Sequence, residues 1–195
     1  MRKVKIHPAF ILIWLLFLLT DKSAYVLYLF LAAAVHETAH ICAFMTYGAN
    51  IEKMEILPFG ISVKLRSATF LSCKKEIVAS LAGVGVNFLL AGLLSLLPGN
   101  LPIDGIPFFI LCNLALGIVN LVPIMPLDGG RCVYFILLSK LDPLKASKIS
   151  LVISYLFLIP LFLLSLYIIV ISKYNFSLLL IVIYLLLYLI VKKTD

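Results

Sequence analysis

Long apolar runs, separated by short polar or charged breaks, fill most of the chain. The breaks are Asp21-Lys22, the polar stretch 50–76, Pro98-Gly99-Asn100, the charged stretch 131–148 and Lys173-Tyr174-Asn175. Most runs between them are close to the ~20 residues that a helix needs to cross a bilayer core. The pattern predicts six membrane spans, at residues 7–20, 24–47, 77–97, 106–127, 149–171 and 176–191.

The polar stretch between the second and third expected spans has the pattern of a β-hairpin. In residues 61–66, apolar side chains alternate with polar ones, which is the period of a strand. The sequence Pro58-Phe59-Gly60 is typical of a turn. We therefore expect an all-α membrane protein of six transmembrane helices with a short membrane-associated β-hairpin in 51–67, whose edge a substrate strand can join. An amphipathic loop on the membrane surface is the alternative.

The composition agrees with a membrane protein. Hydrophobic residues make up 64% of the chain and charged residues 13%, and the mean hydropathy is +1.18, values that exclude an ordinary soluble domain. The four cysteines have no CxxC spacing and are expected to be reduced thiols. No repeat or linker interrupts the pattern, so residues 1–195 are interpreted as a single polytopic membrane domain.

The formal net charge of +7 is informative through the positions of the basic residues. With a cytoplasmic N-terminus, all lysines and arginines except Lys22 and Lys173 fall on the cytoplasmic side of the six expected spans. This distribution follows the positive-inside rule, so we expect a multi-pass protein of the cell membrane with both termini in the cytoplasm. It also accounts for the basic charge without a nucleic-acid partner. The first apolar run lacks a small-residue cleavage site before Asp21, which indicates a retained span.

The second expected span contains HETAH, three ionisable side chains in an otherwise apolar helix. Such groups are costly in hydrocarbon and indicate a function. Residues four apart share one face of a helix, so His36 and His40 can bind one metal ion together. Glu37 lies next to His36, where the HExxH arrangement of zinc enzymes has its general base. The alternative is a pair of buried histidines bonded to backbone carbonyls, beside a protonated Glu37.

A catalytic zinc ion usually has three protein ligands, and Asp128 is the acidic residue best placed to be the third. It follows an apolar run and is flanked by Pro123, Pro126 and Gly129-Gly130. Proline ends a helix and glycine permits unusual backbone angles, so we expect the carboxylate to project from a broken segment into the helix bundle. An Asp-Gly turn at the membrane surface is the alternative.

In these residues the chain resembles the site-2 protease family of intramembrane zinc metalloproteases. HETAH matches the family's HExxH, and NLVPIMPLDGG at residues 120–130 matches its N-x-x-P-x-x-P-L-D-G element. The resemblance implies a zinc cofactor. The site residues that it implies are the zinc ligands His36, His40 and Asp128, the catalytic base Glu37, and Asn120 and Pro123 along the substrate path.

Within the family, the chain is most similar to the stage IV sporulation FB branch of spore-forming bacteria, through IHP at residues 6–8, ILPFG at 56–60 and PLDGGR followed by FILLSK. Two features depart from the family pattern. The third expected span reads AGVGVN, with Val84 where the family often has proline. The chain also ends at Asp195 without the nucleotide-sensing tail of that branch, so regulation through such a tail is expected to be absent or supplied by another chain.

Hydrolysis of a peptide bond among lipid-facing helices requires a polar cavity that admits water. The asparagines expected to line it are Asn87, Asn113 and Asn120. For Asn87 and Asn113, hydrogen bonding between helices is an equally strong interpretation. The glycines of the third and fourth expected spans are expected to allow close packing of helices.

The resulting hypothesis is a zinc metalloprotease that hydrolyses a peptide bond in or near the membrane segment of a regulatory protein. The expected substrate is a membrane-associated or single-span protein, and the sporulation likeness favours a transcription-factor precursor. Regulatory membrane proteins and the lipid bilayer are the other expected partners. Two alternatives stay open: a catalytically silent membrane protein that binds zinc or a client, and an ion transporter that uses Asp128 and the histidines as a relay.

Overall fold

The computed structural model describes residues 3–6, 8, 11, 15, 25–49, 51–57, 60–65, 71–98 and 105–194. The chain forms two compact units, Met1–Ile118 and Val119–Asp195. The first expected span, residues 7–20, lies almost wholly outside the described residues.

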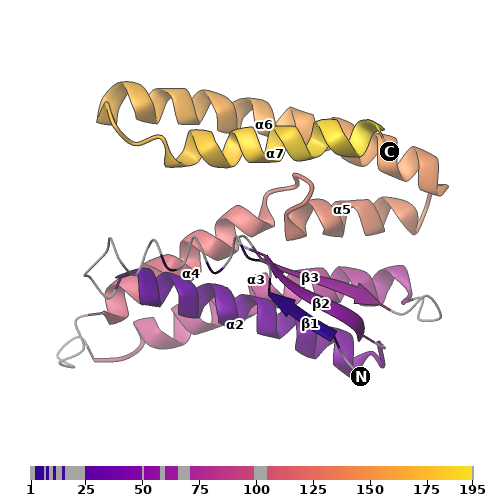
Figure 1. Cartoon of the computed structure of the whole chain (residues 1–195), viewed down its shortest axis with the longest axis horizontal. Coiled ribbons are helices and arrows are strands. Elements are labelled where there is room, and N and C mark those ends of the chain that lie inside the picture. Colours follow the sequence, from indigo (N-terminus) through magenta and orange to yellow (C-terminus); the bar gives the residue numbers. More distant parts are fainter. Residues whose placement is uncertain are drawn as a thin grey trace. The chain divides into compact units, whose positions relative to one another are not determined.

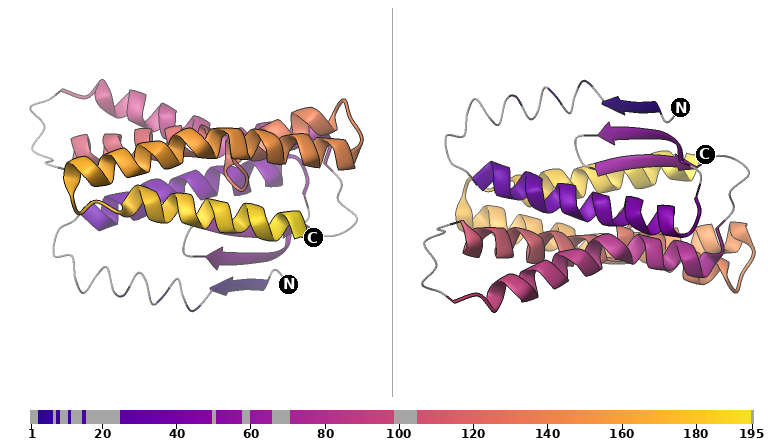
Figure 2. Two further views of the ribbon diagram at one scale, coloured as in Figure 1. Left: turned by 90° about the horizontal axis from the view of Figure 1, so that it is seen from above. Right: turned by 90° about the horizontal axis from the view of Figure 1, so that it is seen from below.

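A three-stranded sheet lies in the first unit. Its strands are β1 (Lys3–Ile6), β2 (Ile51–Leu57) and β3 (Gly60–Leu65), in the order β1-β2-β3. Strands β2 and β3 pair antiparallel as a hairpin, and β1 pairs parallel to β2 on its other side (Figure 2). The backbone therefore has the hairpin that the alternation predicts, and adds to it an N-terminal strand that the sequence pattern did not predict.

Helices α2 (Tyr25–Thr46) and α3 (Cys73–Ser95) pack against each other in the first unit. Small side chains allow this packing, because Ala32 on α2 and Ala79 on α3 are completely buried. The described turn before α4 (Ile106–Leu121) approaches α2 so closely that a Cβ atom at Gly105 would overlap the ring of Tyr28. These contacts fix the positions of α2, α3 and the first part of α4.

The second unit contains α5 (Asp128–Leu138), α6 (Pro143–Ser172) and α7 (Ser177–Thr194). Helices α6 and α7 lie side by side (Figure 1) and share a hydrophobic core with the segment before α5. The buried members of this core are Ile124, Met125, Leu158, Val182, Leu185 and Leu189.

Five of the six expected spans correspond to described helices, namely α2, α3, α4, α6 and α7. The largest differences from the predicted bounds are in α4 and α6. Helix α4 ends at Leu121 and not near residue 127, because a proline-containing segment follows it. Helix α6 begins at Pro143, inside the stretch expected to be a polar break, and the additional short helix α5 precedes it. The prediction of one domain over residues 1–195 stays a prediction.

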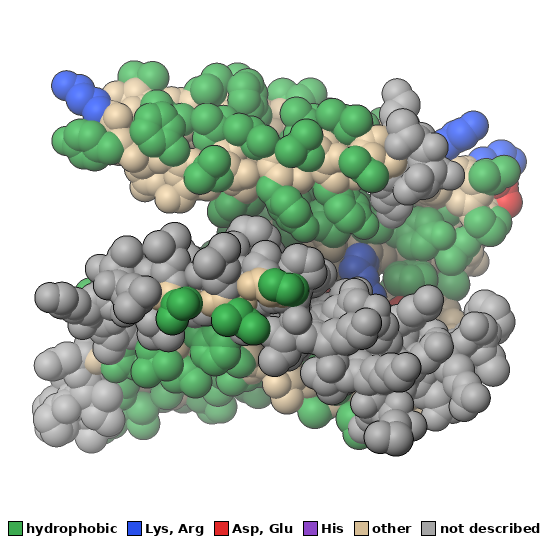
Figure 3. Space-filling model, viewed as in Figure 1, with side chains coloured by type: hydrophobic (Ala, Val, Ile, Leu, Met, Phe, Trp, Pro, Cys, Tyr) green, Lys and Arg blue, Asp and Glu red, His purple; other side chains and the backbone are tan. Residues whose placement is uncertain are grey.

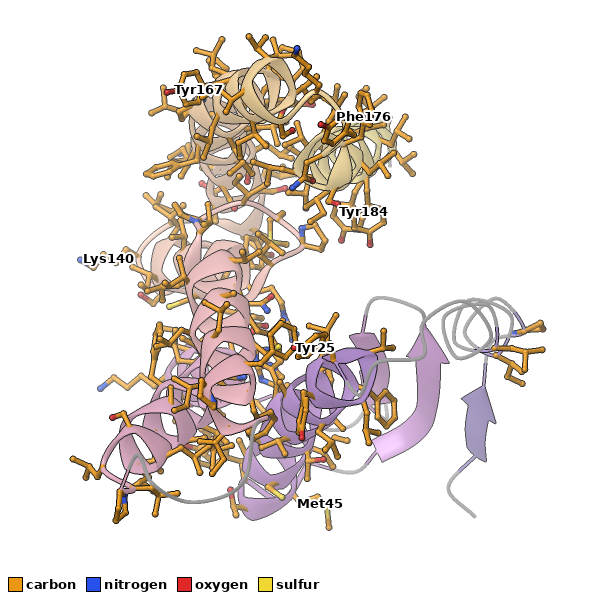
Figure 4. The ribbon with its side chains drawn as sticks, turned by 90° about the vertical axis from the view of Figure 1, so that its left-hand side faces the viewer. Tyr25, Met45, Lys140, Tyr167, Phe176 and Tyr184 are labelled. Carbon is orange, nitrogen blue, oxygen red and sulfur yellow. The ribbon has the colours of Figure 1, made fainter. Side chains whose placement is uncertain are left out.

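Three described helices are long and apolar enough to cross a membrane, namely α2, α3 and α6, while α4 and α7 are shorter apolar helices. Hydrophobic side chains cover the visible face of the α6–α7 pair, and Lys and Arg side chains lie at its ends (Figure 3). Tyr167 on α6 and Tyr184 on α7 point outward from the pair (Figure 4) and are 61% and 44% exposed. Exposed apolar helix surface of this kind is typical of contact with lipid.

The start of α6 is stabilised by Asp142. Its side chain accepts a hydrogen bond of 3.0 Å from the backbone N–H of Lys145, and Pro143 occupies the first turn. The Lys145 ammonium lies 3.2 Å from the same carboxylate. Both the backbone N–H and the side chain of Lys145 hold the pKa of Asp142 below its usual value.

A stability difference that depends on pH follows from this lowered pKa. Since the folded state favours the ionised form, the stabilisation is present above the ordinary carboxyl pKa of about 3.9 and is lost as the pH falls through the lower folded value. We expect Asp142→Ala to lower the thermal midpoint by a few degrees at neutral pH and by less in acid. Asp142→Asn keeps a capping oxygen, so its thermal midpoint should be closer to that of the wild type than the midpoint of Asp142→Ala is. Thermal unfolding in detergent at several pH values checks this, and an equal loss at every pH would contradict it.

Candidate metal centre

Two imidazoles of α2 face each other inside the first unit. His36 and His40 lie one helical turn apart and are only 4% and 6% exposed. Their Nε2 atoms are 3.1 Å apart, and the ring planes are nearly perpendicular, with 4.7 Å between the centroids. The two histidines therefore lie as the sequence predicts for joint binding of one metal ion, with their Nε2 atoms directed at each other.

The contacts of the two Nδ1 atoms determine which nitrogen of each imidazole carries the proton. His40 Nδ1 lies 2.7 Å from the carbonyl oxygen of Ala79, which can only accept, so Nδ1 of His40 carries the proton. His36 Nδ1 lies 2.6 Å from Oδ1 of Asn87, which also accepts. In the neutral ring, a proton on Nδ1 leaves a lone pair on Nε2. Both Nε2 atoms are therefore acceptors directed at a common region.

This donor set fits a zinc ion. Zinc binds imidazole nitrogen at about 2.0–2.1 Å, so two ligands of one tetrahedral ion lie roughly 3.3–3.4 Å apart. The Nε2 separation of 3.1 Å is close to that value. Hydrogen bonding of the second ring nitrogen to a carbonyl or amide oxygen is the usual way in which a metal-binding histidine is oriented.

Gly83 of α3 borders the two imidazoles. A Cβ atom at this position would lie 2.7 Å from Cε1 and 2.8 Å from Nε2 of His36, and still closer to Nε2 of His40. Only glycine leaves room for both rings here. The expected role in close packing is thus confirmed for Gly83, and the packing partners are the two candidate ligands. For Gly85 and Gly92 it is wrong, because a Cβ atom at either position would meet nothing within 4 Å.

Glu37 follows His36 on α2 and is partly buried. Residues one apart on a helix point about 100° away from each other, so Glu37 does not share the face of His36 and His40. This position suits a carboxylate that acts beside a metal ion without binding it.

The residues of the NLVPIMPLDGG element lie in the second unit, where α4 ends. Asn120 is in the last turn of α4, Pro123 is in the irregular segment that follows, and Asp128 is the first residue of α5. The prediction of a broken segment before Asp128 is confirmed. The further expectation that Asp128 itself lies within this segment is wrong, because the aspartate begins a helix.

Close backbone packing explains the two glycines after Asp128. A Cβ atom at Gly129 would overlap the carbonyl of Leu121, and one at Gly130 would overlap the backbone of Ile124. The broken segment is also held by a hydrogen bond of 3.0 Å from the N–H of Met125 to Ser154 Oγ on α6. These contacts fix the start of α5, where Asp128 is 6% exposed and in the first turn, a favourable place for a carboxylate.

The surroundings of the histidines on α3 were not predicted from the sequence. The carbonyl of Ala79 contacts His40, and the side-chain amide of Asn87 contacts His36. Between them, Gly83 has no side chain and so leaves room for both rings. The spacing of four residues places all three α3 positions on one helix face, and this was the available signal. Asn87 was expected to line a cavity or to join helices, and it does hydrogen bond between helices, to His36 and to Asn113.

Comparison with known proteins gives one family match. Residues 100–161, which include the NLVPIMPLDGG element, match the model of "Peptidase family M50". A zinc metalloprotease of Methanocaldococcus jannaschii is 33% identical over 127 residues, which are 63% of this chain and 37% of that protein. Stage IV sporulation protein FB of Bacillus subtilis is 30% identical over 157 residues, 80% of this chain and 54% of that protein. The chain thus matches between about a third and a half of the length of these relatives.

Nearly the whole chain is similar to a solved structure. The site-2 protease from Methanocaldococcus jannaschii superimposes with a TM-score of 0.67 and 26% sequence identity. The superposition covers 94% of this chain and 87% of that one.

Proposed function

Because the chain belongs to the M50 peptidases, the family of the site-2 proteases, we propose that it is an intramembrane zinc metalloprotease. The observation that carries the proposal is the pair of buried imidazoles on α2. Both have Nδ1 hydrogen bonded to an oxygen, and their Nε2 atoms lie 3.1 Å apart. A pair of buried histidines that serves only packing has no reason to direct two lone pairs at one region.

The proposed zinc ligands are His36, His40 and Asp128, and their types suit the ion, because catalytic zinc commonly takes two imidazoles and one carboxylate. The archaeal relative is named a zinc metalloprotease, which supports zinc as the metal. Asp128 lies buried in the first turn of α5, a position that favours its ionised form, which is the form in which a carboxylate binds a metal ion.

The reaction proposed for the site is hydrolysis of a peptide bond. Zinc, when bound, supplies an electrophile that polarises water and a peptide carbonyl. Glu37 accepts the proton of the attacking water and donates it to the departing amide nitrogen. Asn87 and the Ala79 carbonyl hold the two imidazoles in position during this transfer.

The proposed substrate is a membrane-associated or single-span regulatory protein, cut in or near its membrane segment. Asn120, in the last turn of α4, and Pro123, in the irregular segment after it, border its path. The β2–β3 hairpin holds the substrate as a strand added at the edge of β3, since β1 already pairs with β2. The name of the sporulation relative favours a protein of spore formation, with a transcription-factor precursor as the specific candidate. The positions of the basic residues support cytoplasmic termini in the cell membrane.

The test compares two aspartates that begin helices. We expect Asp128→Asn to lower the zinc content of the detergent-purified protein and to reduce cleavage of a single-span test protein at least 100-fold. Asp142→Asn, the same change at the exposed start of α6, should alter neither. Zinc is measured by elemental analysis and cleavage by the appearance of product fragments.

Two outcomes would refute the proposal. If Asp128→Asn keeps both its zinc and its activity, Asp128 is not a ligand. If the wild-type protein binds no zinc under conditions in which its helices are folded, the site is not a metal centre.

A further inference from the structure

Three consecutive hydrogen bonds connect a backbone carbonyl of α4 with the imidazole of His36. Asn113 Nδ2 donates to the carbonyl oxygen of Phe109 at 2.8 Å, and Asn87 Nδ2 donates to Asn113 Oδ1 at 2.9 Å. His36 Nδ1 lies 2.6 Å from Asn87 Oδ1. Both asparagines are completely buried, and all of these residues belong to the first unit. We refer to this chain of contacts as the asparagine relay.

The relay has only one consistent direction. A backbone carbonyl can only accept, so the group of Asn113 that faces Phe109 must be the amide nitrogen, and its oxygen must face Asn87. For the same reason the nitrogen of Asn87 faces Asn113 and its oxygen faces His36. Nδ1 of His36 must therefore be the donor, which leaves the lone pair on Nε2, the atom that faces His40.

The two histidines reach the same tautomer by different means. His40 donates directly to the backbone at Ala79, an acceptor that no substitution removes. His36 faces a side-chain amide, which could present either oxygen or nitrogen if it were free to rotate. Asn113 prevents the rotation, because the reversed Asn87 amide would place two oxygens against each other.

We propose that Asn113, which contacts neither histidine in these hydrogen bonds, is a positioning residue that sets the tautomer of His36 through Asn87. The inference rests on the proposed function in one respect, namely that Nε2 of His36 is a zinc ligand. Partners one contact removed from a metal ligand change metal affinity by about 10–100-fold when they are replaced. The relay extends this influence by one more residue, onto α4.

Two substitutions of similar size separate this role from simple helix packing. Asn113→Leu removes the acceptor for Asn87 Nδ2, so either orientation of the Asn87 amide leaves one of its groups unsatisfied and the amide is free to turn its nitrogen toward His36. Asn113→Asp keeps the acceptor, and when protonated it also keeps a donor for the Phe109 carbonyl. If Asn113 only packs helices in lipid, the apolar leucine is the better tolerated change. The relay predicts the opposite order.

The experiment is ¹⁵N NMR of histidine-labelled, metal-free protein in detergent at mildly alkaline pH. The chain has only three histidines, so the imidazole signals can be assigned with single variants. In the wild type and in Asn113→Asp we expect His36 protonated at Nδ1. In Asn113→Leu we expect a shift of His36 toward the Nε2-protonated form, while His40 keeps its Nδ1 proton as an internal control.

Zinc affinity, measured by competition with a chelator, gives a second readout. We expect a loss of about tenfold or more for Asn113→Leu, and little change for Asn113→Asp or for Asn175→Leu, the same replacement at an exposed turn. The proposal is overturned if wild-type His36 carries its proton on Nε2, or if Asn113→Leu leaves tautomer and affinity unchanged. The wild-type spectrum alone tests the expected tautomer of His36, even if Asn113→Leu does not fold. The NMR measurement uses no zinc and no substrate, so it tests the relay independently of the proposed function. If the tautomers are as expected but the protein neither binds zinc nor cleaves, only the proposed function is refuted.

Discussion

Glu37→Gln is expected to abolish peptide hydrolysis while the zinc content stays at the wild-type level. Glutamine has nearly the same shape as glutamate but cannot accept a proton, so the water that attacks the peptide is no longer activated. General-base catalysis contributes about 10²–10⁴-fold, and the loss of cleavage rate should lie in that range or above it. The measurement is the rate of product formation from a single-span test protein in detergent, alongside zinc analysis of the same sample.

Glu76→Gln is the matched control for this variant. Glu76 lies in the first turn of α3, outside the proposed catalytic and zinc-binding residues, and its replacement should leave the cleavage rate unchanged. If Glu37→Gln cleaves within a few-fold of wild type, Glu37 is not the base. A wild-type protein that carries zinc or protons across vesicles and does not depend on Glu37 would favour the ion-transporter hypothesis.

A methyl group at position 83 is expected to have the second largest effect, loss of zinc by about 100-fold or more in affinity. The added Cβ would lie 2.8 Å or less from the Nε2 atoms of His36 and His40. Neither ring can retreat easily, because Asn87 and the Ala79 carbonyl hold each from the opposite side. Gly83→Ala should therefore displace both lone pairs. Chelator competition measures the affinity, and cleavage should fall in parallel.

Gly85 provides the control for this substitution. It lies two residues further along α3, and a Cβ atom there would meet nothing within 4 Å. Alanine favours a helix over glycine by up to about 1 kcal/mol, so Gly85→Ala should preserve zinc and not lower stability. Equal zinc affinities of Gly83→Ala and Gly85→Ala would show that Gly83 does not border the metal position.

Patterns that depend on neighbouring residues predicted much of the structure. The spacing of His36 and His40 follows from helix geometry alone, and it places their rings together as expected. Alternation and a turn signal located the β2–β3 hairpin. Proline and glycine located the irregular segment before Asp128. In each case the information lies within about ten residues of sequence.

Features that depend on pairing between distant segments were missed. Strand β1 has only four residues and exists through its register with β2, about fifty residues away, which no local pattern encodes. The sequence predicts a charged break where α5 lies, because Arg131 and Lys140 outweigh the apolar residues between them. The contacts of Asn87 with His36 and Asn113 depend on the rotation of α3 against two other helices. Hydropathy is insensitive to such rotation.

The short separation of the two Nε2 atoms also has a consequence for folding. Two lone pairs that face each other repel, and here the contacts of α3 with both Nδ1 atoms hold the rings in that orientation. A divalent cation converts this repulsion into attraction, so its uptake and the association of the two helices are thermodynamically linked, and each favours the other by the same free energy. The ion thereby stabilises the packing of α2 against α3, in addition to any part that it takes in chemistry.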